Sequence, residues 1–429
     1  TEYHVVTHKK AWKRFKTTEA IKPLQGIRVL ELGQLVAGPF CGSILGYYGA
    51  VEPPKIGDPL RIWRHLDKDG QSAWSRSLSR NKKSITLDLK TQEGRDLVKQ
   101  LAEQSDVLIE NFKPGTMEKW GLGPEDIYPA NPKLIYTRIS GYGQTGPYSK
   151  RPGYASVCEG MGGFRFVNGH PGDPPVRPNM SLGDSLAGLH AALGVLLGLI
   201  AKNKLASQTE RTGQVVDVAI YESMLNMMEG VVPEFDRFDE IRQPSGTTVT
   251  GIVPTNTYPC KDGKHVIIGG NGDSIYVRLM NAIGRSDLTG EKYKVNADRV
   301  KEQEAIDGAI GNIWDSAWTL EHTTDEVLEV MEKVSVPAGK IYDAKDIVED
   351  EHINARGMIE NVTVGTKEEG RGWNVKIPGM SPVLGTTPGS TEWAGPDLGE
   401  HTNQVLKDLL GLSDSEIEKL EQDGITKPK

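Results

Sequence analysis

The sequence predicts an α/β protein built on a parallel β-sheet. Short apolar segments typical of buried strands alternate with helical segments of about 10–15 residues, which is the arrangement of βαβ units. The chain has 429 residues, more than one ordinary hydrophobic core accommodates. We therefore expect two domains, one of them inserted in the other.

Strands and helices alternate through the first half of the chain. Strands are predicted at residues 27–32, 84–89, 106–110 and 134–139. The segment 84–89 differs from the others because its polar and apolar residues alternate with period two. Helices are predicted over 39–48, after a glycine-containing turn, and over 91–104, where Leu97, Val98 and Leu101 share one side.

The pattern changes after about residue 221. Residues 229–262 are irregular, a strand is predicted at 265–268, and helices follow to about residue 330. The last helix is expected to begin at Ser413, because Ser413 and Glu416 have the spacing of a capping box. We place the first part of a large domain at 1–225, a small domain at 226–345 and a C-terminal segment at 346–429.

The composition limits the classes of function. With 37% hydrophobic and 25% charged residues, the chain is predicted to be globular rather than disordered. A net charge of −8 argues against nucleic-acid binding, which requires a basic surface. The three cysteines, Cys41, Cys158 and Cys260, fit neither a disulfide framework nor a zinc site, so we expect a reducing compartment and no metal.

Membrane insertion is not expected. The most apolar stretch, Leu186–Ala201, contains His190, ends at Lys202 and is shorter than the roughly 20 apolar residues that span a bilayer. It is therefore interpreted as a helix buried in protein, with His190 packed inside it. The first 22 residues are basic and lack the apolar core of a signal peptide. They are interpreted as a solvated arm, the alternative being what remains after removal of a transit peptide.

Asp184 is a candidate nucleophile at the start of this apolar helix. Free N–H groups and the helix dipole favour an ionised carboxylate there. Ser181 and Asp184 also have the spacing of a capping box, and on the local pattern alone this structural role is favoured.

Three further segments have two interpretations each. Asn111–Gly115 follows a predicted strand, at the edge where open α/β sheets bind ligands. Gly141–Pro147 also follows a strand and is interpreted as a turn rather than a phosphate loop. The basic cluster Arg80–Lys83 could bind phosphate, but such clusters are usually solvated surface. Gly33, Gly38 and Gly42 do not form a dinucleotide-binding fingerprint.

An ordered series of segments is more specific than any one of them. It comprises Pro23–Leu32, Val36–Pro39, Gly57–Arg61, Asn81–Lys90, Glu110–Gly115, Gly141–Pro147, Ser181–Leu189, Val336–Gly339 and Leu398–Thr402. Together these segments resemble the family III CoA-transferases (the CaiB/BaiF type), which include formyl-CoA:oxalate and succinyl-CoA:dicarboxylate transferases.

The resemblance implies a Rossmann-like large domain, an inserted smaller α+β domain and a C-terminal segment that returns to the large domain. It also implies an interlocked homodimer, without a nucleic-acid or membrane partner. Coenzyme A would be a co-substrate rather than a tightly bound cofactor, and the other substrate a carboxylic acid. Both the cytoplasm and the mitochondrial matrix fit this expectation.

The resemblance also implies site residues and a reaction. Asp184 matches the family's nucleophile, which forms aspartyl anhydride and aspartyl-CoA thioester intermediates. The donor would be succinyl-CoA or acetyl-CoA, and the acceptor a short carboxylic acid, preferably dicarboxylic. The loop Gly246–Gly251 is our candidate for covering the site. Positions that match CoA-binding residues of the family are Val36, Ala37, Leu87, Asp88, Leu89, Lys90, Asn111, Phe112, Lys113 and Lys119.

The chain departs from the family pattern at three places. Four strand residues are missing at Gly49–Glu52, an acidic residue is replaced by Ala155, and Val36 stands where formyl-CoA transferases have glutamine, which disfavours oxalate. One alternative is an α-methylacyl-CoA racemase, but Tyr154 and Ala155 stand where those enzymes have a His–Asp pair. The other is a catalytically silent CoA-binding homologue. Cations available for the acceptor are Arg61, Arg138, Arg165 and Arg177.

Overall fold

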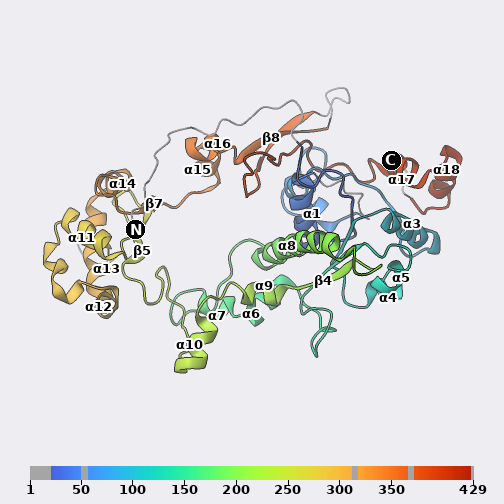
Figure 1. Cartoon of the computed structure of the whole chain (residues 1–429). Coiled ribbons are helices and arrows are strands. Elements are labelled where there is room, and N and C mark those ends of the chain that lie inside the picture. The colour runs from blue at the N-terminus through green and yellow to red at the C-terminus, as the bar shows by residue number, and fades with distance from the viewer. Residues whose placement is uncertain (1–20, 50–56, 312–316, 366–371, 427–429) are drawn as a thin grey trace. The chain divides into compact units, whose positions relative to one another are not determined.

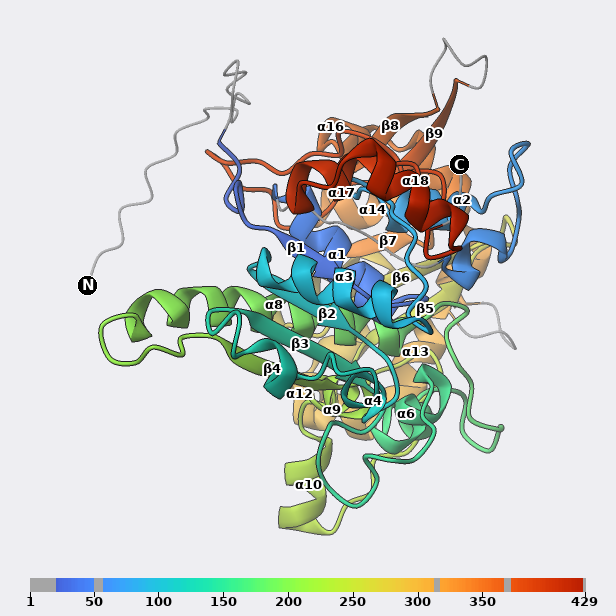
Figure 2. The same cartoon turned by 90° about the vertical axis from the view of Figure 1, so that its right-hand side faces the viewer.

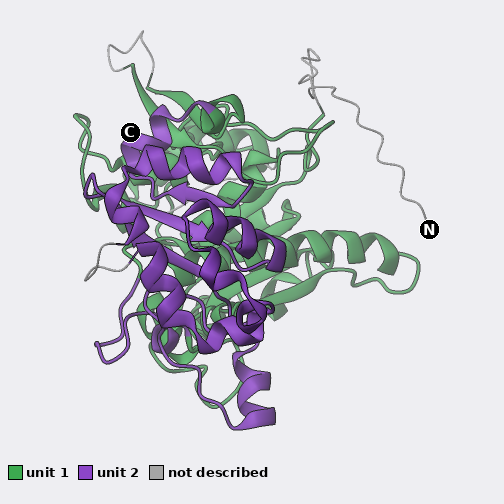
Figure 3. Cartoon of the chain, turned by 90° about the vertical axis from the view of Figure 1, so that its left-hand side faces the viewer, with its two compact units in different colours: residues 1–163, 178–228, 352–429 green, residues 164–177, 229–351 purple. Residues whose placement is uncertain are grey.

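The computed structural model describes residues 21–49, 57–311, 317–365 and 372–426. These residues form two compact units, coloured separately in Figure 3. Unit 1 comprises the described parts of 1–163, 178–228 and 352–429, and unit 2 comprises those of 164–177 and 229–351. The segment 164–177, which we assigned to the large domain from the sequence, thus groups with unit 2. The expected deletion at Gly49–Glu52 lies mostly outside the described residues.

The centre of unit 1 is a parallel four-stranded sheet, as the alternating pattern predicts. Its order is β1 (Val29–Glu31), β2 (Val107–Glu110), β3 (Ile135–Ser140) and β4 (Gln214–Ala219), with each strand paired to the next. Every residue of β1, β2 and β3 is buried, because helices cover both faces of the sheet. The predicted α/β class is therefore confirmed (Figure 1).

Alternate strand residues face two separate cores. Val107, Ile109 and Ile135 pack against α1 (Ala37–Tyr47) and α8 (Leu182–Leu205). Leu108 and Tyr136 point to the opposite face, which is covered by α3 (Gln92–Glu103). Figure 2 shows α3 in front of the sheet. The same core includes α17 (Thr402–Leu410) and α18 (Asp414–Gln422), so the C-terminal segment packs on the sheet domain.

The helix boundaries predicted from local sequence agree with the structure. Thr91 caps α3 by accepting the N–H of Gly94, and α18 begins after Ser413 with the expected capping box to Glu416. The remaining helices of unit 1 are α2 (Ala73–Leu78), α4 (Thr116–Lys119), α5 (Pro124–Ile127), α6 (Ala155–Met161), α9 (Ile220–Leu225) and α16 (Glu351–Ala355, from residue 352), with η1 (Pro59–Ile62) and the hairpin β8 (Ile359–Val364) and β9 (Trp373–Pro378).

The predicted strand at 84–89 is wrong. The segment is buried but belongs to no sheet, because its backbone groups bond to the C-terminal segment instead. The N–H of Thr86 donates to Oγ1 of Thr402 at 3.1 Å, and the N–H of Asp88 donates to the carbonyl of Ile425 at 2.8 Å. The alternation of polar and apolar residues in this segment therefore arises because Ile85, Leu87 and Leu89 face the core, although the segment pairs with no strand.

The interpretation of Arg80–Lys83 as solvated surface is also wrong, since Arg80, Asn81 and Lys82 are buried. Arg80 donates to the carbonyl of Pro378 at 2.6 Å, and Lys82 forms an ion pair with Glu31 at 2.5 Å. These side chains hold the C-terminal segment and β1 in place. Their internal bonds make them poor candidates for phosphate binding.

Helix α8 is longer than the sequence interpretation allowed. It has 24 residues and is, among the residues described, the helix whose length and composition suffice to cross a membrane. Its packing explains why it is nevertheless part of a folded core. A Cβ at Gly188 would lie 2.7 Å from the carbonyl oxygen of Ala37, one at Gly194 2.5 Å from Val216, and one at Gly198 3.1 Å from Ile135. Glycine thus permits α8 to pack directly on α1 and the sheet.

Unit 2 has its own core around an antiparallel sheet of β5 (Thr255–Pro259), β6 (His265–Gly269) and β7 (Ala338–Lys340). The predicted strand at 265–268 corresponds to β6. The helices of unit 2 are α7 (Phe164–Val167), α10 (Val231–Phe238), α11 (Asp273–Ala282), η2 (Ser286–Thr289), η3 (Glu291–Tyr293), α12 (Asn296–Lys301), α13 (Gln303–Gly311), η4 (Trp318–Glu321), α14 (Thr324–Lys333) and α15 (Ala344–Glu349).

Candidate active site

The first turn of α8 lies at the carboxyl edge of the parallel sheet. A Cβ at Gly183 would lie 3.2 Å from the side chain of Ile220, the residue that follows β4, whereas Gly198 lies against Ile135 at the start of β3. Helix α8 therefore runs antiparallel to these strands. Asp184 lies at the edge where open α/β sheets bind ligands.

The alternative role of Asp184, as part of a helix-capping box with Ser181, is not supported by the hydrogen bonds of Ser181. The side chain of Ser181 accepts no capping hydrogen bond, and only its backbone carbonyl bonds to the N–H of Ser185 at 3.0 Å. The reciprocal capping box is therefore not formed. Asp184 itself is half-buried.

A second carboxylate lies next to this turn. Glu159 on α6 is fully buried, and its Oε1 accepts the N–H of Gly183 at 3.2 Å. Burial raises the pKa of the neighbouring Cys158 thiol to about 11, and the negative charges of Asp184 and Glu159 add to this effect. Cys158 therefore stays a neutral thiol, and its Sγ donates to the carbonyl of Gly141 at 3.3 Å.

Glu159 is not among the site residues predicted from the sequence. The sequence indicates only that Ala155 replaces an acidic residue usual in the family. Because Ala155 and Glu159 are four residues apart on α6, they share one face of that helix. A helical reading of 155–161 would have identified this carboxylate as a neighbour of the substituted position.

The loop between β1 and α1 is tied to the loop after β2. The Asn111 side chain accepts the N–H of Gln34 at 2.5 Å and donates to its carbonyl at 2.8 Å. Gly33 and Gly38 approach so closely that a Cβ at Gly38 would lie 2.9 Å from the Cα of Gly33. The predicted CoA-binding segments around residues 36–37 and 111–113 are thereby held together.

Asp58 holds the same loop from another direction. Its carboxylate accepts the N–H of Leu35 at 3.0 Å and the N–H of Leu60 at 2.9 Å. Leu35 has a φ of 62°, a conformation that side chains rarely adopt, and the bond to Asp58 stabilises it. This is the structural role of the segment Gly57–Arg61.

Helix α1 begins beside the first turns of α8. Val36 is the N-cap residue of α1, and the carbonyl of Ala37 faces Gly188, one turn after Asp184. The structure therefore brings Val36, Ala37 and Asn111 into the neighbourhood of the candidate nucleophile.

The remaining predicted CoA-binding positions differ in their environment. Leu87 and Leu89 are buried in the core, so only their backbone groups could contact a ligand. The side chain of Asp88 accepts the N–H of Lys90 at 2.9 Å, while Lys90 itself is exposed.

The segment after β2 carries two exposed lysines between the members of an aromatic pair. Phe112 packs edge-to-face on Trp120 with ring centroids 5.2 Å apart. Lys113 and Lys119 lie between these two aromatic residues in the sequence and are both exposed. Two such cations suit a ligand that carries phosphate groups.

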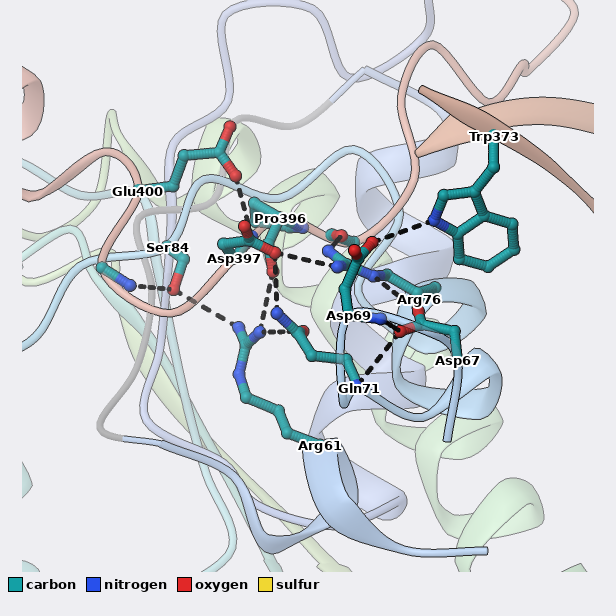
Figure 4. Close-up of polar contacts among 12 residues, drawn as sticks. Arg61, Asp67, Asp69, Gln71, Arg76, Ser84, Trp373, Pro396, Asp397 and Glu400 are labelled. Carbon is teal, nitrogen blue, oxygen red and sulfur yellow. Dashed lines mark hydrogen bonds and ion pairs between the residues drawn. The ribbon is translucent and has the colours of Figure 1, made fainter. Parts of the chain in front are cut away.

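Two of the four arginines suggested for the acceptor are engaged within unit 1. Arg61 donates to Gln71 at 3.1 Å and to the carbonyl of Pro396 at 2.7 Å (Figure 4). Burial lowers its pKa, and the neighbouring Arg76 adds to this effect. Arg138 binds two glutamates, whereas Arg165 and Arg177 lie in unit 2.

The loop 246–251, our candidate for covering the site, lies in unit 2. The N–H of Gly246 donates to the carbonyl of Gly169 at 2.9 Å. Gly246 has a φ of 68°, and a Cβ there would lie 2.9 Å from His170. No cluster of three or more metal-ligating side chains occurs in the described part of the chain.

A parallel α/β core with a half-buried carboxylate at its ligand-binding edge defines a class of α/β proteins that carry a candidate nucleophile at that edge. Within that class, the model of CoA-transferase family III matches residues 24–402. The chain belongs to CoA-transferase family III, which confirms the resemblance found in its motifs.

Relatives and solved structures support the same assignment. The chain is 43% identical over 405 residues to succinyl-CoA–D-citramalate CoA-transferase of Chloroflexus aurantiacus, covering 93% of this chain and 97% of the relative. It is 30% identical over 413 residues to human succinyl-CoA:glutarate CoA-transferase, covering 94% and 90%. The crystal structure of a CaiB/BaiF family protein from Brucella suis superposes with a TM-score of 0.78 at 29% identity, covering 90% and 99%.

Proposed function

We propose that this enzyme transfers CoA from succinyl-CoA, or from acetyl-CoA, to a short dicarboxylic acid. The observation that carries the proposal is the position of Asp184, in the first turn of α8 and beside the N-terminus of α1. The names of the relatives support succinyl-CoA as donor and a dicarboxylic acid as acceptor, since citramalate and glutarate each carry two carboxylates.

Asp184 would act as the nucleophile. Its carboxylate attacks the donor thioester, which gives a mixed anhydride and CoA thiolate. The thiolate attacks the Asp184 carbonyl, which gives an aspartyl-CoA thioester and releases the donor acid. The acceptor carboxylate attacks this thioester, and the thiolate then attacks the acceptor carbonyl of the new anhydride, which regenerates Asp184. An aspartate is ionised at neutral pH, so this sequence needs no separate general base.

CoA would bind along the carboxyl edge of the sheet, with Val36, Ala37 and Asn111 near the thioester and the lysines at 90, 113 and 119 near the phosphates. The bonds between Asn111 and Gln34 support this arrangement, because they hold two of these segments together. Unit 1 would supply the Rossmann-like domain, and unit 2 the inserted α+β domain.

The exposed face of α8 supports a homodimer, which we propose to be interlocked. Leu189, Leu193, Leu197 and Ile200 lie on this face at helical spacing, and each is 50–58% exposed. So large an apolar face is unusual for a monomer. Light scattering after size exclusion should give twice 47.0 kDa. All three cysteines are buried thiols, which fits a cytoplasmic or a mitochondrial-matrix location equally.

The decisive test is substitution of the nucleophile. Asp184→Asn should abolish exchange of labelled succinate with succinyl-CoA, by at least about a thousandfold, while the fold and dimer persist. Ser181→Ala is the matched control, since its side chain makes no capping bond, and it should retain near-normal activity. Full activity of Asp184→Asn would exclude the proposal.

Substrate trials separate the two alternatives. A panel of carboxylic acids with succinyl-CoA and acetyl-CoA, read by mass spectrometry, identifies the acceptor. Deuterium incorporation into a 2-methylacyl-CoA without an acceptor acid would instead indicate a racemase. Tight CoA binding without label exchange would indicate a silent homologue.

A further inference from the structure

Three ionisable side chains form a chain of hydrogen bonds at the carboxyl ends of β2 and β3. Nε of Arg138 donates to Glu110 at 2.7 Å, and its Nη1 and Nη2 donate to the two carboxylate oxygens of Glu118 at 2.6 and 3.2 Å. Glu110 is 1% exposed and Arg138 is 6% exposed. We call this set the Arg138 clamp.

The clamp joins both ends of one loop. Glu110 is the last residue of β2 and Glu118 lies in α4, so the residues between them, 111–117, begin and end at a side chain bound to Arg138. The second oxygen of Glu110 accepts the N–H of Phe112 at 2.8 Å, which fixes the start of the loop as well. Arg138 belongs to the neighbouring strand β3. Its bonds therefore fix the position of the loop relative to the sheet.

The next strand extends the same row of charges. Asp217 of β4 is the register partner of Arg138, and its carboxylate oxygens accept the N–H of Gln144 at 3.2 and 3.0 Å. The loop after β3 is therefore fixed by a carboxylate in the same row. Glu110, Arg138 and Asp217 thus form one row across β2, β3 and β4. Their side chains hold the loops that follow β2 and β3.

We propose that Arg138 is a positioning residue for the CoA subsite, acting through the segment 111–119, which carries Asn111, Lys113 and Lys119. This inference rests on the proposed function, because it assigns CoA binding to those residues. Arg138 is not assigned as a ligand in this arrangement, since each of its three guanidinium nitrogens already donates to one of the two glutamates. Its bidentate geometry suits the role, because a planar fork fixes orientation as well as distance.

The clamp should affect the binding of the CoA ester and not the binding of the acceptor acid. Loosening residues 111–119 displaces Asn111 and the two lysines together, whereas the first turn of α8 is held by Glu159 and Ile220 on other elements. A clamp variant should therefore raise the KM for succinyl-CoA while kcat and the acceptor KM change little. A purely structural loss would lower the active fraction, and hence kcat, without this split.

Glu118→Gln is the first test, since Glu118 is half-exposed and its loss leaves the buried Arg138–Glu110 pair intact. We expect the KM for succinyl-CoA to rise about tenfold, with kcat within about twofold, because one charge-assisted bidentate contact is lost. The matched control is Glu125→Gln on the adjacent helix α5, which breaks an exposed ion pair between Glu125 and Arg211 at 3.7 Å. It should change neither kcat nor the KM for succinyl-CoA.

Arg138→Lys is the second test, since lysine keeps the charge but not the fork. It should reproduce the rise in KM, and CoA binding by calorimetry should weaken to a similar extent in both variants. Unchanged CoA affinity in folded Glu118→Gln protein overturns the inference, even if Arg138→Lys fails to fold. Absence of CoA binding by the unmodified protein would instead overturn the proposed function, together with this inference, which rests on it.

Discussion

The buried carboxylate of Glu159 accepts the backbone N–H of Gly183, the residue immediately before Asp184, at 3.2 Å. This N–H belongs to the first turn of α8, where backbone donors have no partner within the helix. Glu159 therefore fixes the direction of the turn that carries the candidate nucleophile. The relationship links α8 to α6, the helix on which Ala155 replaces an acidic residue.

Removing Glu159 should destabilise this turn. Glu159→Ala leaves the Gly183 N–H unsatisfied in a buried environment, which costs about 1–3 kcal/mol, and it also opens a cavity. Glu159→Gln keeps an oxygen acceptor, so we expect a smaller loss. Urea unfolding of both variants measures the difference, and equal stability of the two would show that the hydrogen bond is unimportant.

The contact between Gly33 and Gly38 should be intolerant of a methyl group. A Cβ at Gly38 would lie 2.9 Å from backbone, which cannot rotate away, so the β1–α1 loop must shift. We expect Gly38→Ala to lower stability by about 1–3 kcal/mol and to weaken CoA binding. Gly308→Ala in α13 is the control, because nothing lies within 4 Å of its Cβ position. It should stabilise the protein by about 0.5–1 kcal/mol. Near-normal CoA affinity in Gly38→Ala would argue against a role for this loop in binding.

The sequence predicted the elements whose burial is decided locally. Strands β2 and β3 are rich in apolar residues because both faces of the sheet are covered, and α3 begins directly after Thr91 because the Thr91 side chain caps its first turn. The segment 84–89 has an equally good pattern, but Thr86 finds its partner in Thr402, which is 316 residues away. No local pattern reveals so distant a partner.

The site shows the same limit. The spacing of Ser181 and Asp184 fits a capping box, yet the Ser181 side chain does not form one. Arg80 and Lys82 have the composition of a solvated cluster but are buried by Pro378 and Glu31, which come from distant segments. Asp184 is preferred as a candidate nucleophile only through the family resemblance, because residue type and helix position fit both of its interpretations.

Arg76 should be essential for holding the C-terminal segment. It donates to the carbonyl of Gly395 at 2.7 Å and pairs with Asp397 at 2.8 Å, beside the buried Asp67 (Figure 4). Arg76→Ala removes the pair with the partly exposed Asp397 and leaves the buried Asp67 carboxylate without its nearby cation, so we expect a loss of about 1–3 kcal/mol in the free energy of unfolding. Hydrogen exchange should accelerate at residues 393–400.

The control for Arg76 is Arg64→Ala. The Arg64 guanidinium is exposed and lies 4.1 Å from the ring centroid of Trp74, a contact worth about 0.5–1 kcal/mol. Its removal should leave exchange at 393–400 unchanged. Equal destabilisation by the two substitutions would contradict the role assigned to Arg76.

Glu110 should make stability depend on pH. Burial raises the pKa of Glu110 from 4.5 to about 7, although Arg138 and the N–H of Phe112 lower it. The Glu118 charge raises it further, and Tyr136 also faces Glu110. The folded protein therefore binds this proton more tightly than the unfolded chain does. The resulting stabilisation is complete below about pH 4.5 and is lost as the pH rises through about 7. It amounts to roughly 3 kcal/mol.

Glu110→Gln removes this titration while keeping an oxygen near Arg138. The free energy of unfolding, measured in urea from pH 5 to pH 8, should then fall less steeply with pH in the variant than in the unmodified protein. Glu118 is the comparison, because its hydrogen bonds to Arg138 lower its pKa, so its stabilisation is lost only as the pH falls toward that lower pKa. Glu118→Gln should therefore remove no titration of its own between pH 5 and pH 8, and it should only move the Glu110 transition to lower pH, because the Glu118 charge raises the Glu110 pKa. An identical slope in all three proteins would show that Glu110 stays ionised throughout this range.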